Sequence, residues 1–325
     1  MVGWTDRNIP ALTGCTALVT GANSGLGLQA ALGLARAGAR VLMAARDAAR
    51  GAQALDRVRA EVPAARVELV GLDLADLGAV QAAATAVTER VDALDLLVNN
   101  AGVMALPPRV SADGFELQLA TNHLGHFALT GRLLPVLLAA PAPRVVTVSS
   151  QAHRFGHIAF DDLQSLRRYD PWQAYGRSKL ANLLFSAELQ RRADAAGVPL
   201  RSAAAHPGLA STNIQKPGPE MSGKPLLAAV MTATSRVVAQ SDRAGAWPVL
   251  YAATMPDVGP DGYLGPRGLF EARGHPRHVG RSEAARDLDV ARRLWQESER
   301  LTGVTYTWPA QAGQGRPEGV PGAEQ

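Results

Sequence analysis

Short apolar runs along the chain alternate with longer stretches in which apolar residues recur every three or four positions. The runs are apolar at successive positions, as expected of strands covered on both faces. They are TALVT (16–20), RVLMAA (40–45), RVELVGL (66–72), LDLLVNN (94–100), RVVTVSS (144–150), RSAAAH (201–206) and, more weakly, GYLG (262–265). The helical stretches include 25–37, 47–61, 76–91, 114–139 and 172–195. The alternation predicts an α/β fold, a doubly wound parallel sheet of about seven strands with helices on both faces.

A glycine-rich turn joins the first strand to the first helix in TALVTGANSGLGLQAALGLARAG. Its glycines let the backbone turn sharply and approach a pyrophosphate, which exposed N–H groups and the helix N-terminus would hold. The spacing is TGxxxGxG rather than GxGxxG. Because the turn follows the first strand of a β-α-β unit, phosphate binding is favoured over a plain strand-to-helix turn. The predicted loop consists of Gly21, Asn23, Ser24, Gly25, Leu26 and Gly27.

The end of the second strand, VLMAARDAAR, indicates which dinucleotide would bind. An NAD-preferring site usually has a carboxylate there to hold the ribose hydroxyls, but this chain has Ala45 followed by Arg46. A guanidinium pairs with a 2′-phosphate, so NADP(H) is predicted in preference to NAD(H). Asp47 keeps NAD(H) open as the alternative, unless it caps the next helix. Asp73, with Leu74 beside it, ends the third strand and is placed to accept from the adenine amino group.

No linker interrupts the alternation, so we predict one Rossmann-like dinucleotide-binding domain over residues 1–305. Residues 207–240, rich in Pro, Gly, Ser and Met, stand outside the pattern and are predicted to form a substrate loop or lid. Residues 306–325 have the composition of a flexible C-terminal tail.

The stretch AYGRSKLANLLFSAEL (174–189) has the periodicity of a helix that is mostly buried. At 100° per residue, one narrow polar stripe is formed by Tyr175, Lys179, Asn182 and Ser186. Apolar residues flank the stripe on both sides, whereas Arg177 and Glu188, on the opposite side, are predicted to face water.

Charge and composition narrow the class of protein. The 33 basic and 29 acidic residues are interspersed and give a net charge of +4, which does not favour nucleic acid as a partner. Cys15 is the single cysteine, so no disulfide forms within the chain. The N-terminus lacks the features of a signal peptide, and Arg132 and Pro135 interrupt the most apolar stretch. We therefore expect a soluble, cytoplasmic protein with no membrane span.

Six motifs then occur in the order found in a known family. They are TGANSGLG, NNAG (99–102), Asn122 in TNHLGHF, Ser150 in VTVSS, YGRSK (175–179) and HPG (206–208). On these motifs the chain resembles the short-chain dehydrogenase/reductase family over roughly residues 10–305. The phrases DGFELQLATNHLGHFALT and AYGRSKLANLLFSAELQRR resemble the subgroup that contains retinol dehydrogenases and related bacterial reductases.

The resemblance implies hydride transfer between nicotinamide and a carbonyl carbon, with Tyr175 as the acid in reduction and the base in oxidation. Lys179 would lower the pKa of this tyrosine and hydrogen-bond the nicotinamide ribose. Ser150, rather than Ser149, would hydrogen-bond the substrate oxygen, since alternation along the strand places the two serines on opposite faces. Asn122 would locally open its helix and hold a water that relays protons to Lys179.

The same resemblance implies further cofactor contacts. Besides Tyr175 and Lys179, they are expected from Asn100, Ala101, Gly102, Pro207, Gly208 and Thr212. Pro207 and Gly208 would bind the nicotinamide carboxamide through their backbone, so no role is expected for the imidazole of His206. Thr212 would reach the cofactor phosphate.

Ser150 and Tyr175 are 25 positions apart, further than in many family members, and the intervening segment resembles the retinol-dehydrogenase subgroup in length and in AFDDLQ. It is predicted to line the substrate entrance. Because no cysteine or carboxylate cluster accompanies His153 and His157, packing or surface roles are expected for them, and no metal.

The sequence therefore predicts an NADPH-dependent reductase of lipophilic aldehydes or ketones that runs reversibly as an alcohol dehydrogenase. One alternative is a carbon–carbon double-bond reductase resembling protochlorophyllide reductase; another is a catalytically silent NADP(H)-binding protein. The two apolar flanks of helix 172–195 predict a homodimer through this helix, or a cover provided by the chain's own 207–240 segment.

Overall fold

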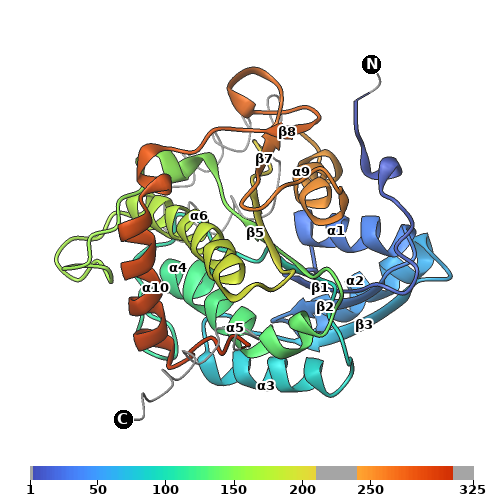
Figure 1. Cartoon of the computed structure of the whole chain (residues 1–325), viewed down its shortest axis with the longest axis horizontal. Helices are drawn as coiled ribbons and strands as arrows, with labels where there is room; N and C mark the ends of the chain where they lie inside the picture. The colour runs from blue at the N-terminus through green and yellow to red at the C-terminus, as the bar shows by residue number, and fades with distance from the viewer. Residues whose placement is uncertain (1–2, 210–239, 310–325) are drawn as a thin grey trace, which may run out of the picture.

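Eight strands form one sheet in the computed structural model, which describes residues 3–209 and 240–309 (Figure 1). The strand order is β3-β2-β1-β4-β5-β6-β7-β8, parallel except for β8. The strands are β1 (Thr16–Thr20), β2 (Arg40–Ala45), β3 (Arg66–Gly71), β4 (Leu96–Asn99), β5 (Arg144–Val148), β6 (Arg201–Ala205), β7 (Tyr263–Pro266) and β8 (Pro276–His278). The predicted doubly wound sheet is confirmed. The pattern missed only β8, a three-residue edge strand without an apolar run.

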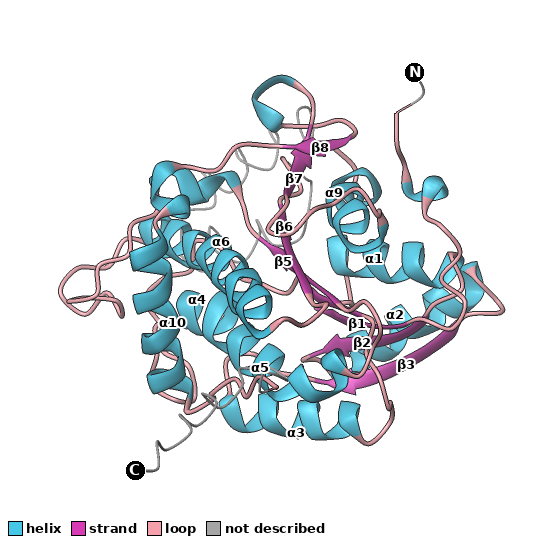
Figure 2. Ribbon diagram, viewed as in Figure 1, coloured by secondary structure: helices cyan, strands magenta, loops and turns pink. Residues whose placement is uncertain are grey.

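Helices cover both faces of the sheet (Figure 2). The α-helices are α1 (Gly25–Arg36), α2 (Ala48–Glu61), α3 (Leu77–Thr88), α4 (Leu117–Leu119), α5 (Gly125–Leu138), α6 (Pro171–Ala196), α9 (Asp242–Thr254) and α10 (Leu288–Thr302). The short helices are the 3-10 turns η1 (Asp6–Asn8), η3 (Gln151–Phe155), η5 (Leu269–Glu271) and η6 (Glu283–Arg286) and the π-helix η2 (Ala120–Leu124).

The hydrophobic core has two layers because the strands are buried on both faces. Ala17 and Val19 of β1 pack with α1, α2 and α9, whereas Leu18 between them packs with α3 and α5. This alternation is the reason that the strand runs are apolar at successive positions.

Helix α6 is bounded by local sequence signals. Asp170 caps its N-terminus by accepting from the backbone N–H groups of Trp172 and Gln173, Pro171 occupies the first turn, and Gly197 ends the helix with φ 67°. The polar stripe points toward the sheet.

The side of α6 opposite the stripe does not face water as predicted. Glu188 is completely buried, and its Oε1 lies 2.6 Å from Arg191 Nη2 and 2.8 Å from Arg192 Nε. Arg177 donates to the backbone oxygens of Asp162 and Leu163. The prediction was wrong because Glu188 pairs with two arginines of its own helix, and Arg177 packs against the segment that precedes the helix.

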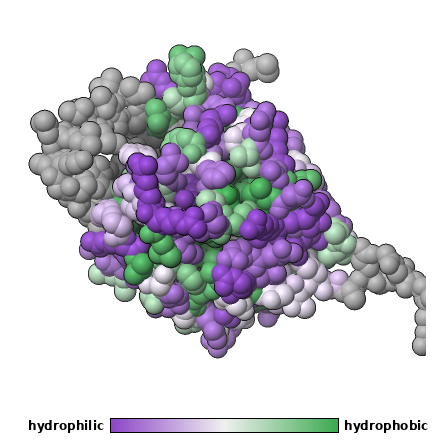
Figure 3. All heavy atoms as spheres, turned by 90° about the vertical axis from the view of Figure 1, so that its left-hand side faces the viewer, coloured by the Kyte–Doolittle hydropathy of each residue, from purple (hydrophilic) through white to green (hydrophobic). Residues whose placement is uncertain are grey.

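The apolar flanks of α6 are also covered within the chain. Leu183 and Leu184 pack with Leu294 of α10, and Phe185 stacks on Trp295 with ring centroids 5.8 Å apart. The outer face around α10 is mainly hydrophilic, with hydrophobic residues in small separate patches (Figure 3). Residues of α10 thus cover apolar positions of α6 within the chain, and the homodimer stays a prediction.

The packed chain extends past the predicted boundary at residue 305. Tyr306 is buried, its hydroxyl donates to Phe127 O at 2.7 Å, and its ring packs against Trp295. Aromatic burial overrides the loop-like composition of its surroundings. Within residues 3–209 and 240–309, no helix has the length and apolar content needed to cross a bilayer.

Candidate active site

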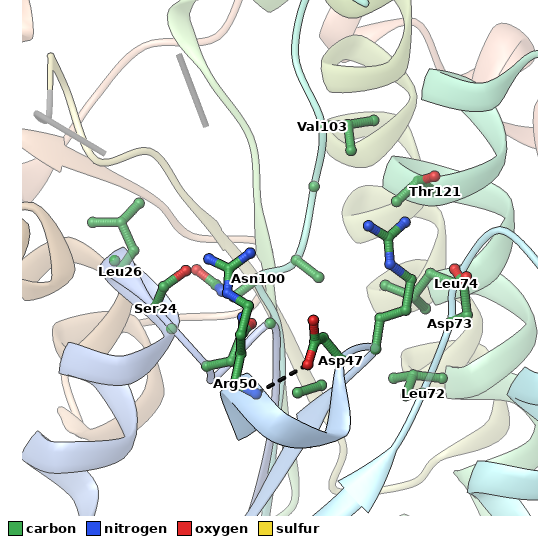
Figure 4. Close-up of a pocket in the computed structure, with 18 of the residues that line it drawn as sticks. Ser24, Leu26, Asp47, Arg50, Leu72, Asp73, Leu74, Asn100, Val103 and Thr121 are labelled. Carbon is green, nitrogen blue, oxygen red and sulfur yellow. Dashed lines mark hydrogen bonds between the residues drawn. The ribbon is translucent and has the colours of Figure 1, made fainter. Parts of the chain in front are cut away.

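A cleft of about 680 Å³ opens at the carboxyl ends of β1 to β4 (Figure 4). In a doubly wound sheet this edge, where strand order reverses between β1 and β4, is the usual ligand site. Among its lining residues are Gly21, Asn23, Ser24, Gly25, Leu26, Gly27, Arg46, Asp73, Leu74, Asn100, Ala101 and Gly102. The structure thus brings together every predicted cofactor residue of the first 102 positions.

The glycine turn has the geometry of a phosphate cradle. Gly21 and Gly25 have φ of 66° and 54°, and a Cβ on Gly27 would lie 2.3 Å from Gly21 O. Ser24, at the N-cap of α1, makes no capping hydrogen bond with its side chain. The first N–H groups of α1 therefore face the cleft, ready for an anion.

Two arginines line the adenosine end of the cleft. Asp47 caps α2, because its carboxylate accepts from Arg50 N at 3.0 Å. Helix capping is the role that the sequence left open for it as the alternative to binding the ribose of NAD(H). Neither Arg46 nor Arg50 has an ion-pair partner within residues 3–209 and 240–309. Figure 4 shows Arg50 pointing into the cleft from α2. Arg50 was not predicted as a site residue from the sequence. Its position in the first turn of the helix after the second strand could have indicated it.

Asp73 lies on the opposite wall of the adenosine end. Its Oδ1 accepts from Ala75 N at 2.9 Å, which orients the carboxylate. The other predicted residue here, Leu74, is buried beside it.

A hydrogen-bonded chain that the sequence did not predict supports the floor of the cleft. Thr20 Oγ1 accepts from the backbone N–H groups of Asn100 and Ala101, both at 2.9 Å. The Thr20 hydroxyl itself donates to His126 Nε2 at 2.9 Å. On the other side of the ring, His126 Nδ1 donates to Asn122 O at 3.0 Å. Burial lowers the pKa of His126 to about 4, so the imidazole is neutral, as this chain requires.

The predicted helix 114–139 is interrupted at Asn122, as expected for that residue. The π-helix η2 separates α4 from α5. Asn122 Oδ1 accepts from Val103 N at 2.8 Å, while Nδ2 donates to Val103 O and Ser178 Oγ, both at 2.9 Å. Its side chain therefore fixes the strand-to-loop junction where the cleft ends.

The two serines that follow β5 contact different residues of α6. Ser149 Oγ donates to Lys179 O at 2.8 Å and is buried. The Ser150 side chain lies close enough to Tyr175 to lower the pKa of its phenol, and Ser150 Oγ accepts from Ala152 N at 3.2 Å. Ser150 is thus the serine that shares a site with the tyrosine.

Tyr175 and Lys179 lie one turn apart on α6 and are both buried. Lys179 Nζ donates to Val148 O at 3.1 Å and lies 5.8 Å from the centre of the Tyr175 ring. A Cβ on Gly102 would lie 3.4 Å from Lys179 Nζ, so the ammonium borders the cleft. The polar stripe of α6 therefore meets the cofactor cleft at Gly102.

The direction of the tyrosine pKa differs from the prediction. Burial raises the pKa of Tyr175 to about 12, against a smaller opposite effect of the Ser150 hydrogen bond. Burial also lowers the pKa of Lys179 to about 8. Loss of solvation is the larger effect on this pKa, and Tyr175 is a neutral phenol at neutral pH, which is a proton donor.

The other predicted residues lie after β6 or in the segment before α6. Pro207 and Gly208 form a turn at the carboxyl end of β6, where Gly208 has φ 68°. Thr212 and most of the predicted lid 207–240 lie outside the described residues, and the lid stays a prediction. His153 is buried, and its Nδ1 bonds Ser150 O at 2.7 Å. Residues 3–209 and 240–309 hold no group of three His, Cys, Asp or Glu suited to a metal.

A dinucleotide cleft that ends at a Ser-Tyr-Lys set, with the tyrosine and the lysine buried, defines an NAD(P)-dependent oxidoreductase. Residues 15–222 match the model of the short chain dehydrogenase family. The chain belongs to this family.

Individual relatives agree with this assignment. Human retinol dehydrogenase 13 is 38% identical over 294 residues, which cover 90% of this chain and 86% of the relative. A putative uncharacterized protein from Mycobacterium paratuberculosis has a solved structure that is 44% identical, with a TM-score of 0.76, covering 94% of this chain and all of the other. The structure described as the Pseudomonas aeruginosa RhlG/NADP active-site complex is 26% identical, with a TM-score of 0.61, covering 78% and 94%.

Proposed function

We propose that the protein is an NADP(H)-dependent carbonyl reductase that interconverts lipophilic aldehydes or ketones with their alcohols. The observation that carries the proposal is the Ser150 side chain beside the phenol of Tyr175, which is buried in an apolar cluster next to Lys179 and the end of the cleft. This arrangement places a proton donor and a second hydrogen-bond donor where a carbonyl oxygen can meet both.

The donor set of the cleft supports NADP(H) as the cofactor. The uncapped start of α1 suits a pyrophosphate, and the unpaired guanidinium of Arg46 suits a 2′-phosphate. The NADP complex of the RhlG relative supports the same choice. Pro207 and Gly208 would bind the nicotinamide carboxamide, and Asn100, Ala101 and Gly102 would line the path to it.

The chemistry needed from the chain is proton transfer and orientation, while a bound nicotinamide supplies or accepts the hydride. Tyr175 Oη gives its proton to the carbonyl oxygen as negative charge develops there, and Ser150 Oγ–H donates to the same oxygen. Lys179 holds the ribose and keeps positive charge near the phenol. Asn122 holds Val103 and thereby the wall of the site.

The surroundings of the tyrosine support a lipophilic substrate. Tyr175 packs with Met104, Ala105 and Ala152 in one buried apolar cluster. Trp172, 42% exposed, meets the tyrosine ring edge-on with centroids 6.3 Å apart. These side chains offer apolar surface and few polar partners to a substrate, and the relative named retinol dehydrogenase takes its name from a lipophilic alcohol.

The proposal includes a cytoplasmic location. It is supported by Cys15, a free thiol that is partly exposed and compatible with a reducing compartment. Fractionation of cells that express the full chain tests this part, and recovery only with membranes would contradict it.

The test is NADPH oxidation, followed by nicotinamide absorbance, with three kinds of acceptor. A series of straight-chain aldehydes and ketones is compared with a short hydroxylated aldehyde and with a conjugated alkene that has no carbonyl. We expect turnover of the carbonyl compounds with kcat/KM rising with chain length. Turnover of the alkene alone would indicate the double-bond reductase, and NADPH binding without any turnover would indicate a silent binding protein.

A further inference from the structure

His206, for which no imidazole role was expected, is held on both sides of its ring. It is completely buried at the end of β6, and Gly208 N donates to its Nδ1 at 3.2 Å. Since Nδ1 accepts, the ring proton is on Nε2, which donates to Glu271 Oε2 at 3.0 Å. A Cβ on Gly265 of β7 would lie 2.1 Å from Nε2, so a glycine is required beside the ring.

Glu271 also contacts the segment that starts immediately after Ser150. Gln151 Nε2 donates to Glu271 Oε2 at 3.4 Å and to Phe270 O at 2.5 Å. Arg154 Nη2 lies 3.6 Å from Glu271 Oε1. The hydrogen bond from His206, and then the charge of Arg154, hold the pKa of Glu271 below its ordinary value, so the carboxylate stays ionised at neutral pH.

The backbone around Glu271 lies directly against the turn after β6. A Cβ on Gly208 would lie 2.4 Å from Ala272 O, and Leu209 N donates to that oxygen at 2.8 Å. Phe270 and Glu271 have φ of 51° and 54°, a left-handed backbone that costs about 1 kcal/mol or more for each non-glycine residue. The side-chain contacts of Glu271 offset this cost.

We propose that Glu271 is a positioning residue that sets the nicotinamide-binding turn and Ser150 at a fixed separation. Through His206 it fixes the Pro207–Gly208 backbone, and through Gln151 it fixes the start of η3, which Ser150 caps. This inference rests on the proposed function, because it assigns the turn to the carboxamide and Ser150 to the substrate oxygen. The two groups determine where the hydride is delivered and where the carbonyl oxygen is held.

The experiment compares Glu271→Ala and Glu271→Gln with wild type in binding and in turnover. Binding is measured for NADPH, by the fluorescence of its nicotinamide, and for adenosine 2′,5′-bisphosphate, which lacks the nicotinamide half. We expect Glu271→Ala to weaken NADPH binding about tenfold and to lower kcat by a similar factor, without changing the affinity for the bisphosphate. The Gln variant keeps an oxygen that accepts from His206 Nε2, so it should retain most of both properties.

Two further variants separate positioning from general destabilisation. Glu297→Ala removes a carboxylate that is paired with Arg300 on α10, remote from the cleft, and should change none of these quantities. Gln151→Ala removes only the contact to the Ser150 side. It should lower kcat several-fold and leave NADPH affinity within about twofold of wild type. Because Gln151 is partly exposed, this variant is expected to fold even if Glu271→Ala does not.

Each outcome decides the inference. Equal loss of NADPH and bisphosphate binding in Glu271→Ala, or no loss of either, overturns it, as does a Gln variant as impaired as the Ala variant. An unchanged kcat in Gln151→Ala overturns the link to Ser150. A wild-type protein that fails to bind NADPH or to reduce carbonyls contradicts the proposed function itself, and is seen before any variant is measured.

Discussion

The two ends of the cleft are built in opposite ways. At the adenosine end, Arg46 and Arg50 are exposed, and neither has an ion-pair partner in the described part of the chain. At the nicotinamide end, Tyr175, Lys179 and Asn122 are 6%, 2% and 0% exposed, and the side chains of Lys179 and Asn122 are hydrogen-bonded.

This difference indicates that the two ends of the cleft have different roles. Unpaired exposed cations cost the folded protein little and gain an ion pair only when an anion binds, so they supply affinity and selectivity. Burying a set of polar groups costs solvation free energy when the protein folds. The buried groups then need no rearrangement during the reaction. Substitutions at the adenosine end should therefore change binding, and substitutions at the nicotinamide end should change turnover.

The largest effect is expected from Tyr175→Phe. The ring and its packing with Met104 remain, but the proton donor is lost, so kcat should fall by about 10³-fold. NADPH affinity, measured by fluorescence titration, should stay within about threefold, since only one hydroxyl is removed. Tyr251 lies on α9, and its hydroxyl donates to Asp257; Tyr251→Phe serves as the control and should retain full turnover. Substantial turnover in Tyr175→Phe would remove the tyrosine from the mechanism.

The next largest effect is expected from Arg46→Asp at the opposite end. Replacing the cation by a carboxylate repels a 2′-phosphate and accepts the ribose hydroxyls of NADH. The ratio of kcat/KM for NADPH to that for NADH should fall by about 10²-fold, with kcat at saturating cofactor almost unchanged. Arg57→Asp, which lies on α2 and pairs with Glu61, is the matched charge reversal and should leave the ratio unchanged. A wild type that already prefers NADH would refute the role of Arg46.

The adenosine end could be predicted from sequence because its signals are local. The glycine turn, Arg46 and Asp73 each stand at the end of a strand whose apolar run is visible, and parallel strands bring their carboxyl ends together. The proposed catalytic set could also be predicted, because the motifs place Ser150 at the end of a strand and Tyr175 on a helix.

The rest depends on long-range contacts that no local pattern encodes. The burial of Tyr306 results from contacts with Phe127 and Trp295. The contact of Glu271 with His206 spans 65 positions and occurs in a turn whose sequence resembles a loop. The pKa of Tyr175 was predicted in the wrong direction because the depth of burial, which decides it, is invisible in a helical wheel.

The solvation cost at the nicotinamide end can be measured through Lys179→Met. The pKa of Lys179 is about 8 when folded, against the ordinary 10.5 when unfolded. Between pH 8 and pH 10.5 the folded state therefore binds fewer protons than the unfolded state. The free-energy cost of burying the Lys179 ammonium is fully present below pH 8. At pH 7 the variant should gain about 3 kcal/mol in free energy of unfolding while losing turnover, and this gain should shrink as the pH rises toward 10.5. Urea unfolding at two pH values measures it, and lower stability at pH 7 would contradict it.

The same group sets the expected pH profile of reduction. The ammonium of Lys179 is lost as pH rises through about 8, whereas Tyr175, at about 12, remains protonated. The kcat/KM for the carbonyl substrate should therefore fall about tenfold per pH unit above pH 8, and be flat between pH 6 and 7. Initial rates across this range, with cofactor affinity measured at each pH, test the profile. A constant kcat/KM up to pH 10 would show that the charge of Lys179 is not required.

The smallest effect is expected from Arg50→Ala. This variant also tests whether Arg50 and Arg46 have different roles at the adenosine end. Figure 4 shows this side chain extending into the cleft on the side of Ser24, where the pyrophosphate would lie, a group that NADPH and NADH share. The variant should weaken both cofactors about fivefold and leave their ratio unchanged, because one exposed charge-assisted contact contributes about 1 kcal/mol. The combination with Arg46→Asp should then be additive in NADPH affinity. A change in the cofactor ratio caused by Arg50→Ala alone would instead place this guanidinium at the 2′-phosphate, so that both arginines would discriminate between the cofactors.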